Sequence, residues 1–235
     1  MDFFPAILII SFIGGIVSVD TTSGWQIMIS QPVVSCPVIG LIFGFPEIGL
    51  IMGILLELPW LIDIPSGGAH GSEGNLGAVT ATALAIFLKS RDISTDNIII
   101  IVTIVYSLGV SYIGGLLVNI TRKANTSLQH AADIAADKAD LRQINWLNFV
   151  GLFYAFLLGF FLVGFFFTIG VFFLPAIAGF IHPEFDSAFG LAKYSILGLG
   201  FGVVATLFIN KETKWYFAIA FAASIIILVL NSFFQ

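Results

Sequence analysis

The sequence predicts an all-α, polytopic membrane protein, and three observations carry that prediction. Hydrophobic residues make up 58% of the 235-residue chain and charged residues only 10%, far from the usual composition of a soluble domain. The mean hydropathy is +1.05. The apolar residues also form runs close to the roughly 20 residues that a helix needs to cross about 30 Å of hydrocarbon. A water-soluble protein is therefore excluded.

Five of these runs are bounded by polar or charged residues and predict full transmembrane helices. They are residues 3–19, 98–117, 149–168, 191–209 and 215–230. The first run lacks the basic start and the small-residue cleavage pattern of a secretion signal, so we expect it to be a retained span.

Four other apolar pieces are too short or too interrupted to be ordinary spans: residues 33–45, 48–62, 76–88 and 169–181. Such pieces are typical of broken or re-entrant helices. Irregular backbone at membrane depth is tolerated only where protein or a water-filled cavity surrounds it, and the exposed helix ends then offer N–H and C=O groups to a polar ligand. We therefore predict one membrane-embedded domain over residues 1–235, with the substrate region in residues 31–88.

Residues 118–148 differ in composition from the rest of the chain. Alanines recur at helical spacing between charged residues such as Asp133, Asp137 and Arg142. This pattern predicts an amphipathic connector helix at the interface, outside the hydrocarbon.

The stretch from Glu57 to Asn75 gathers most of the unusual polar chemistry. An ionised carboxylate among leucines costs about 2.5–3.5 kcal/mol by insertion scales, so Glu57 is expected to face a polar cavity. Carboxylates, amides and glycine backbone can bind several hydroxyl groups at once, and Trp60 offers an apolar face, which together favour a sugar site. The alternative for residues 63–75 is an ordinary extramembrane loop. The candidate substrate-binding residues are Gln31, Glu57, Trp60, Asp63, Ser66, Gly67, His70, Glu73 and Asn75.

Several other functions are disfavoured by the composition. The net charge of −5 gives no cationic field for nucleic acid. The single cysteine, Cys36, excludes an intrachain disulfide, and His70 with Glu73 falls short of the three or four ligands of a zinc site. No nucleophile elbow or phosphate loop occurs. We expect neither a metal nor a cofactor, and no covalent chemistry on this chain.

Three patterns carry a resemblance to a known family. The first is a glycine ladder with a terminal acid, Gly40-x3-Gly44-x4-Gly49-x3-Gly53-x3-Glu57, whose steps of four residues, with one of five, would align the glycines on one helix face. The second is Glu57-Leu-x-Trp60 followed by Pro65-x-Gly67-Gly68-Ala69. The third is Gln129-His130-Ala-Ala-Asp133-x-Ala-Ala-Asp137, followed by Ile144-Asn-Trp146.

In these patterns the chain resembles the IIC membrane subunit of the mannose, fructose and sorbose class of bacterial phosphotransferase system (PTS) sugar permeases. It departs from the family pattern at Gln31, where a basic residue is common, at Phe45, and at Gly71-Ser72-Glu73, which replaces a Pro-Pro-acid sequence. The chain is therefore similar to a divergent member of this family.

The resemblance implies a multi-pass protein of the bacterial cell (inner) membrane that binds a hexose-type sugar and moves it inward. It also implies a homologous IID membrane subunit, soluble IIA and IIB proteins that phosphorylate the sugar, surrounding lipid, and a trimer of C/D pairs. The connector around His130 would engage a partner. Two alternatives stay open: an ion-coupled secondary transporter in which Glu57 or Asp63 carries a proton, and a permease-derived scaffold without transport.

Overall fold

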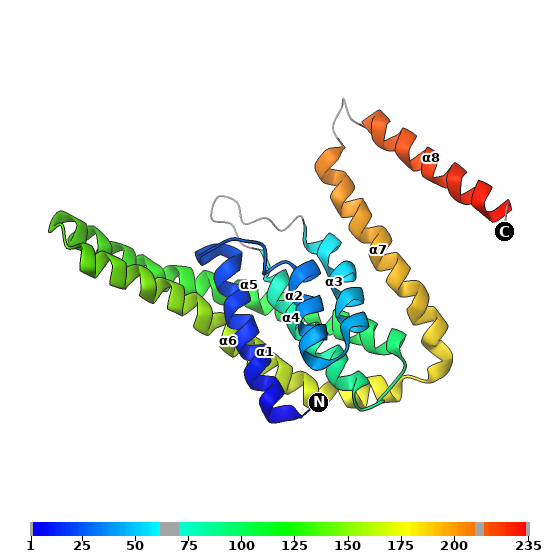
Figure 1. The fold of residues 1–235 in the computed structure, drawn as a ribbon, viewed down its shortest axis with the longest axis horizontal. Coiled ribbons are helices and arrows are strands. Elements are labelled where there is room, and N and C mark those ends of the chain that lie inside the picture. The colour runs from blue at the N-terminus through cyan, green and yellow to red at the C-terminus, as the bar shows by residue number, and fades with distance from the viewer. Residues whose placement is uncertain (1, 62–70, 210–213, 234–235) are drawn as a thin grey trace.

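A computed structural model describes residues 2–61, 71–209 and 214–233, and every regular element in these ranges is helical. The all-α prediction is confirmed. The elements are α1 (Phe3–Ser18), the π-helical η1 (Val19–Ser23), α2 (Pro32–Phe43), α3 (Pro46–Trp60), α4 (Gly74–Lys89), α5 (Asp96–Asp137), α6 (Leu141–Phe180), the short 3-10 helix η2 (Pro183–Phe185), α7 (Asp186–Phe208) and α8 (Lys214–Phe233) (Figure 1).

Helix α4 lies at the centre of the core. Its side chains from Leu76 to Leu88 are all buried, and it contacts α1, α2, α3, α5 and α6. A short helix that is enclosed on every side needs no polar face. The hydroxyls of Thr80 and Thr82 are satisfied locally, because they donate to the carbonyls of Leu76 and Ala78 at 2.8 Å.

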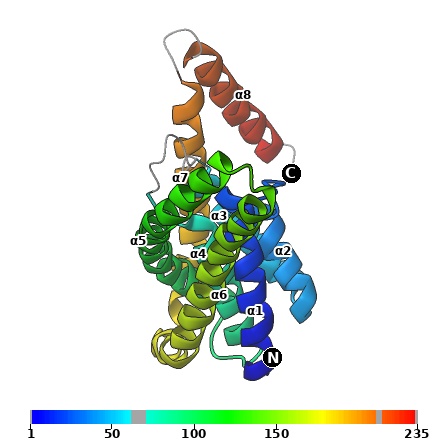
Figure 2. The ribbon, with the colours of Figure 1, turned by 90° about the vertical axis from the view of Figure 1, so that its left-hand side faces the viewer.

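Helix α1 packs along α6 (Figure 2). Small residues make this contact. A Cβ on Gly14 would lie 2.9 Å from the carbonyl oxygen of Gly159, and one on Gly15 would lie 2.5 Å from the ring of Phe156. Without side chains the two backbones approach closely, which is how helices gain dispersion contacts in lipid.

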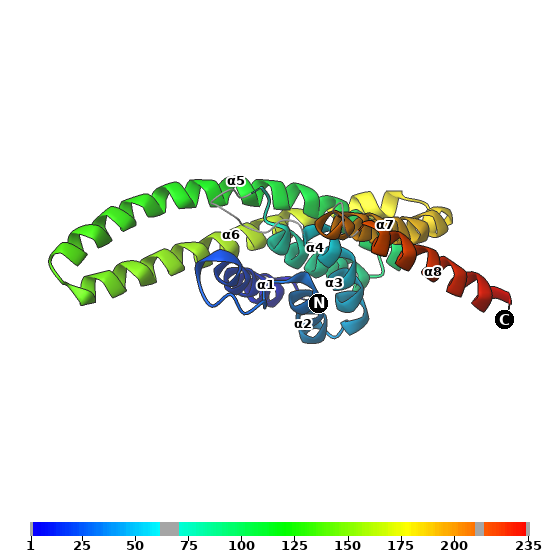
Figure 3. The ribbon, with the colours of Figure 1, turned by 90° about the horizontal axis from the view of Figure 1, so that it is seen from above.

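Helices α5 and α6 form a long antiparallel hairpin of 42 and 40 residues that reaches well beyond the other helices (Figure 3). Ala139 turns the chain with φ 52°, and the carboxylate of Asp140 caps α6 by accepting a 3.0 Å hydrogen bond from the N–H of Gln143. The predicted helical character of residues 118–148 is confirmed. The segment is not a separate connector, however, but the end of α5 and the start of α6.

The predicted short piece at 169–181 is also continuous with α6. Pro175 lies within the helix without ending it, since neighbouring helices in a membrane bundle compensate for one lost backbone hydrogen bond. Gly170 lets α6 pass directly over Leu84 of the central helix, because a Cβ there would lie 2.5 Å from the leucine side chain. This close contact keeps the segment in register with the core.

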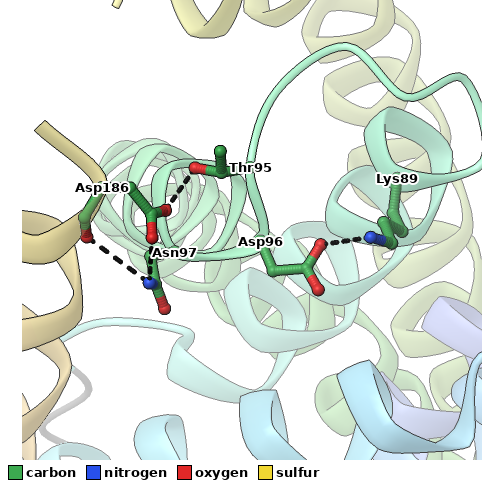
Figure 4. A network of polar contacts seen from close by, with 5 residues as sticks. All are labelled: Lys89, Thr95, Asp96, Asn97 and Asp186. Carbon is green, nitrogen blue, oxygen red and sulfur yellow. Dashed lines mark hydrogen bonds and ion pairs between the residues drawn. The ribbon is translucent and has the colours of Figure 1, made fainter. Parts of the chain in front are cut away.

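Helix α7 is anchored at its start to the start of α5 (Figure 4). The carboxylate of Asp186 accepts hydrogen bonds from the hydroxyl of Thr95 and, at 2.8 Å, from the amide of Asn97. Nearby, the Lys89 ammonium lies 2.6 Å from the Asp96 carboxylate, and this hydrogen bond raises the pKa of Lys89 above its usual value. Further along, α7 packs on α3, where Gly200 meets Leu58.

Four of the described segments are long and apolar enough to cross a membrane: Phe3–Thr21, Asp96–Asp137, Leu141–Phe180 and Pro183–Thr206. They correspond to four of the five predicted spans. The fifth predicted span, 215–230, lies within the helix α8. The short predicted pieces 33–45, 48–62 and 76–88 correspond to α2, α3 and α4, so the sequence separated long helices from short ones over the first half of the chain.

Candidate functional site

The glycine ladder forms the turn and the interface of a helical hairpin, not one face of a single helix. Gly44 adopts φ 77°, which ends α2, and Pro46 occupies the first turn of α3. A Cβ on Gly49 would lie 2.6 Å from the carbonyl oxygen of Cys36 and 2.9 Å from the Cα of Gly40. The prediction of a one-face ladder was therefore wrong, because the chain reverses at Gly44 and brings the glycines of α2 and α3 face to face.

This reversal brings Glu57, near the end of α3, to the start of α2. Its Oε2 accepts a 3.0 Å hydrogen bond from the backbone N–H of Val33. Pro32, the first residue of α2, has no N–H, so Val33 carries the first free donor of this helix end. The half-buried carboxylate is thus stabilised by the partial positive charge of a helix N-terminus.

Gln31 precedes the same helix end. Its carbonyl oxygen accepts 2.9 Å hydrogen bonds from the N–H groups of Val34 and Ser35, while its side chain makes no capping bond to α2. Gln31 and Glu57 therefore both lie at the N-terminus of α2: Gln31 precedes it in the chain, and Glu57 reaches it from α3.

Trp60, the last residue of α3, packs against the start of α4. Its indole lies so close to the Cα of Gly74 that any side chain at that position would overlap the ring. The indole Nε1 is shielded from solvent and has no hydrogen-bond partner among the described residues. A buried donor of this kind favours a nearby acceptor, such as a ligand hydroxyl oxygen.

Glu73 and Asn75 occupy the start of α4. Glu73 is 3% exposed, its N–H donates to the carbonyl of Ser111 at 2.9 Å, and its Cβ packs over Gly114. It also lines a polar cavity of 160 Å³. The amide of Asn75 contacts the hydroxyl of Thr21 at 3.4 Å and so links α4 to η1.

The predicted site residues that the structure describes thus fall into two neighbouring groups. Gln31 and Glu57 lie at the start of α2, Glu73 and Asn75 lie at the start of α4, and Trp60 bridges the two. Asp63, Ser66, Gly67 and His70 lie outside the described residues. Within the described ranges no group of three His, Cys, Asp or Glu side chains is placed to hold a metal ion.

Sequence reasoning missed Asp20. Its carboxylate is 2% exposed and accepts hydrogen bonds from the N–H groups of Ile27 at 2.8 Å and Ser30 at 2.9 Å. It therefore holds the loop 24–30, in which Trp25 and Met28 have positive φ angles, against the end of α1. The signal in the sequence was an acid directly after the first apolar run. In the structure Asp20 lies on a π-helical turn, and π-helical turns are frequent at functional sites.

Comparison with known proteins defines the family. The family model for the PTS system sorbose-specific IIC component matches residues 4–232. The chain belongs to this family. The expected resemblance is confirmed, and with the apolar helices it makes this IIC-family chain a multi-pass cell-membrane protein.

Curated relatives support the same assignment over part of their length. The chain is 34% identical over 122 residues to the sorbose-specific EIIC component of Lacticaseibacillus casei, which is 52% of this chain and 41% of the relative. It is 32% identical over 143 residues to the sorbose-specific EIIC component of Klebsiella pneumoniae, covering 61% and 49%. It is 28% identical over 123 residues to the mannose-specific EIIC component of Escherichia coli K12, covering 52% and 43%. The chain thus matches less than half the length of these relatives.

Two solved structures share the fold. One, described as a membrane protein, aligns with a TM-score of 0.72 at 20% identity and covers 99% of this chain and 94% of the other. The second is the mannose transporter ManYZ in complex with microcin E492, with a TM-score of 0.59 at 20% identity, covering 95% and 88%.

Proposed function

We propose that this IIC-family chain is the sugar-binding and translocating subunit of a mannose-class PTS permease, and that it moves a hexose-type sugar inward while partner subunits phosphorylate it. The family match over residues 4–232 carries the proposal. Curated relatives are named for sorbose, mannose and, putatively, N-acetylgalactosamine, which makes these three sugars the first candidates.

The geometry supports a sugar site at the converging ends of α2, α3 and α4. A carboxylate has about four lone-pair sites, so Glu57 retains capacity for sugar hydroxyls beside its bond to Val33. Trp60 supplies an aromatic face together with a buried N–H donor, and Asn75 supplies an amide. The proposed site also includes Gln31, Glu73 and the predicted residues Asp63, Ser66, Gly67 and His70.

The proposed partners are a homologous IID membrane subunit and soluble IIA and IIB proteins, which would supply the phosphoryl chemistry. The tip of the α5–α6 hairpin is suited to a contact with one of them. It carries exposed His130, Asp133 and Asp137 beyond the apolar part of the two helices. A trimer of C/D pairs is proposed by family resemblance.

The direct test is sugar uptake by membrane vesicles that contain this chain and the IID subunit from the same genome. The vesicles are loaded with phosphoenolpyruvate and the soluble PTS proteins and are given labelled mannose, sorbose or N-acetylgalactosamine. We expect one of these sugars to accumulate as its phosphate, and only when phosphoenolpyruvate is present. Vesicles without this chain serve as the control.

Two results would contradict the proposal. Uptake driven by a pH gradient without phosphoenolpyruvate would favour the proton-coupled transporter. Copurification with the IID subunit without uptake of any of the three sugars would favour the scaffold.

A further inference from the structure

Two adjoining hollows lie where η1 meets the α5–α6 hairpin. The inner one is a cavity of 160 Å³. The outer one is an open cleft of 380 Å³, within the ~300–1,000 Å³ range of small-molecule sites. Ser23 and Asn125 line both, so the two hollows are adjacent parts of one region. Its other polar lining residues are Ser18, Glu73, Thr121, Arg122, Gln129 and Asn148.

Asn125 is the amide side chain that the two hollows share. Its Oδ1 is shielded from solvent and accepts no hydrogen bond from the described residues. A shielded carbonyl oxygen without a donor is unfavourable, and it gains a donor if the Asn125 amide turns toward a hydroxyl group bound in the cavity. Asn125 comes from α5 and Ser23 from η1, so a ligand between them would contact both parts of the fold.

The charges of the inner cavity favour a neutral ligand. The buried carboxylate of Glu73 and the guanidinium of Arg122 line the same small space and have opposite signs. Their fields oppose each other, and the carboxylate repels a phosphate dianion that Arg122 alone would attract. Hydroxyls, amides and a charge of each sign together offer both donors and acceptors, which matches a solute whose hydroxyl groups do both.

We propose that this space is a second binding site of the translocation route, specific for a neutral polyhydroxylated solute and closed to the phosphorylated form. The inference rests on the proposed function, which makes that solute the transported sugar. The sugar passes from the ends of α2, α3 and α4 by Glu73 to Asn125 and the cleft beyond. Because the site rejects the phosphate ester, product formed elsewhere does not return along this route.

Labelling of an introduced cysteine can test whether a ligand binds at this site. Cys36 is its single cysteine and is 0% exposed, whereas Ser23 is exposed and lines both hollows. In the complete complex, Ser23→Cys therefore introduces one reactive thiol at the site. We expect the transported sugar to slow its labelling by a maleimide, and the 6-phosphate of that sugar to leave the rate unchanged. In the control Ser127→Cys, an exposed position on the same hairpin, neither compound should change the rate.

A second variant tests the role of Asn125 itself. Asn125→Leu in the Ser23→Cys background should raise the half-protecting sugar concentration about tenfold, as expected for one lost hydrogen bond. Asn119→Leu, an exposed position on the same helix, should leave it unchanged. A folding defect would be recognised independently by loss of copurification with the IID subunit.

The outcomes separate this inference from the proposed function. If wild-type vesicles take up a sugar but neither that sugar nor Asn125→Leu alters labelling at position 23, the second site is wrong and the proposed function stands. Equal protection by sugar and sugar phosphate would overturn the specificity for a neutral ligand. If the wild-type complex takes up none of the three sugars, the proposed function fails, and this inference fails with it.

Discussion

The carboxylate of Glu57 on α3 accepts a 3.0 Å hydrogen bond from the backbone N–H of Val33 on α2, 24 residues earlier in the chain. This bond joins the end of one short helix to the start of another. It gives the intramembrane acid a partner in the backbone, so the charge that looks anomalous in sequence is compensated by a helix N-terminus. A residue so placed can hold the hairpin together and still face a ligand.

The Glu57→Gln variant separates these two roles. The amide oxygen of glutamine can still accept from Val33, so we expect the complex to assemble normally. The neutral amide binds sugar hydroxyls more weakly than a carboxylate does, and sugar affinity should fall about tenfold. Glu47→Gln, an exposed position at the start of the same helix, is the control. Wild-type affinity in Glu57→Gln, measured by titration calorimetry, would remove Glu57 from the sugar site.

The contact between Gly40 and Gly49 predicts a strong effect of a single methyl group. Gly49→Ala places a Cβ 2.6 Å from the carbonyl oxygen of Cys36, so the backbones of α2 and α3 must separate. We expect a loss of about 1–3 kcal/mol in the free energy of unfolding, measured in detergent. Gly109→Ala on α5 meets no atom within 4 Å and should be neutral or stabilising. Equal stability of the two variants would show that the α2–α3 interface is looser than described.

The Asp20 carboxylate is expected to hold the loop 24–30 in its conformation. Asp20→Ala removes the acceptor for the N–H groups of Ile27 and Ser30, and the positive φ angles of Trp25 and Met28 then lose their support. Hydrogen exchange at Ile27 and Ser30 should become faster by about tenfold or more, since each bond to a charged acceptor contributes about 1.5–3 kcal/mol. Asp2→Asn, at an exposed position before α1, should not change these two amides. Unchanged protection in Asp20→Ala would mean that other contacts hold the loop.

The Asp186 carboxylate is expected to attach the start of α7 to the start of α5. Asp186→Ala removes the acceptor for Thr95 and Asn97, the polar connection between the starts of α7 and α5 (Figure 4). Hydrogen exchange over the first two turns of α7 should become several-fold faster, because the start of the helix loses this polar attachment. Glu184→Gln, two residues earlier and exposed, is the matched control. The same exchange rates in both variants would show that packing on α3 alone positions α7.

The sequence predicted the helices because apolar run length is a local property. Residues 3–19, 98–117 and 149–168 became parts of the candidate membrane spans Phe3–Thr21, Asp96–Asp137 and Leu141–Phe180, and the short runs in 33–88 became α2, α3 and α4. Run length did not predict where helices continue past their apolar part. Residues 118–148 prolong α5 and α6 because hydrogen bonding along a helix is indifferent to side-chain polarity. The turn between them depends on Ala139 and Asp140, which give little signal in a polar stretch.

The candidate site was predictable only where a residue conflicts with its surroundings. Glu57 stands out because an acid among leucines is costly in lipid. Asp20 does not, since an acid at the end of a span has the usual appearance of an interface residue. Asn125 was missed for a similar reason. It lies in a polar stretch of α5, and only the approach of η1 turns that part of the helix surface into the wall of a cavity.

The sequence by itself determined that this chain is helical, that it lies in a membrane and that it belongs to the sorbose-type IIC family, because composition, run length and motif spacing are properties of the linear chain. Only the tertiary structure decided which groups meet. The reversal at Gly44 sets Gly40 against Gly49 and brings Glu57 to the start of α2. These pairings depend on backbones approaching to van der Waals distance. The left-handed φ angle of Gly44 makes that approach possible, and no pattern of hydropathy encodes this angle.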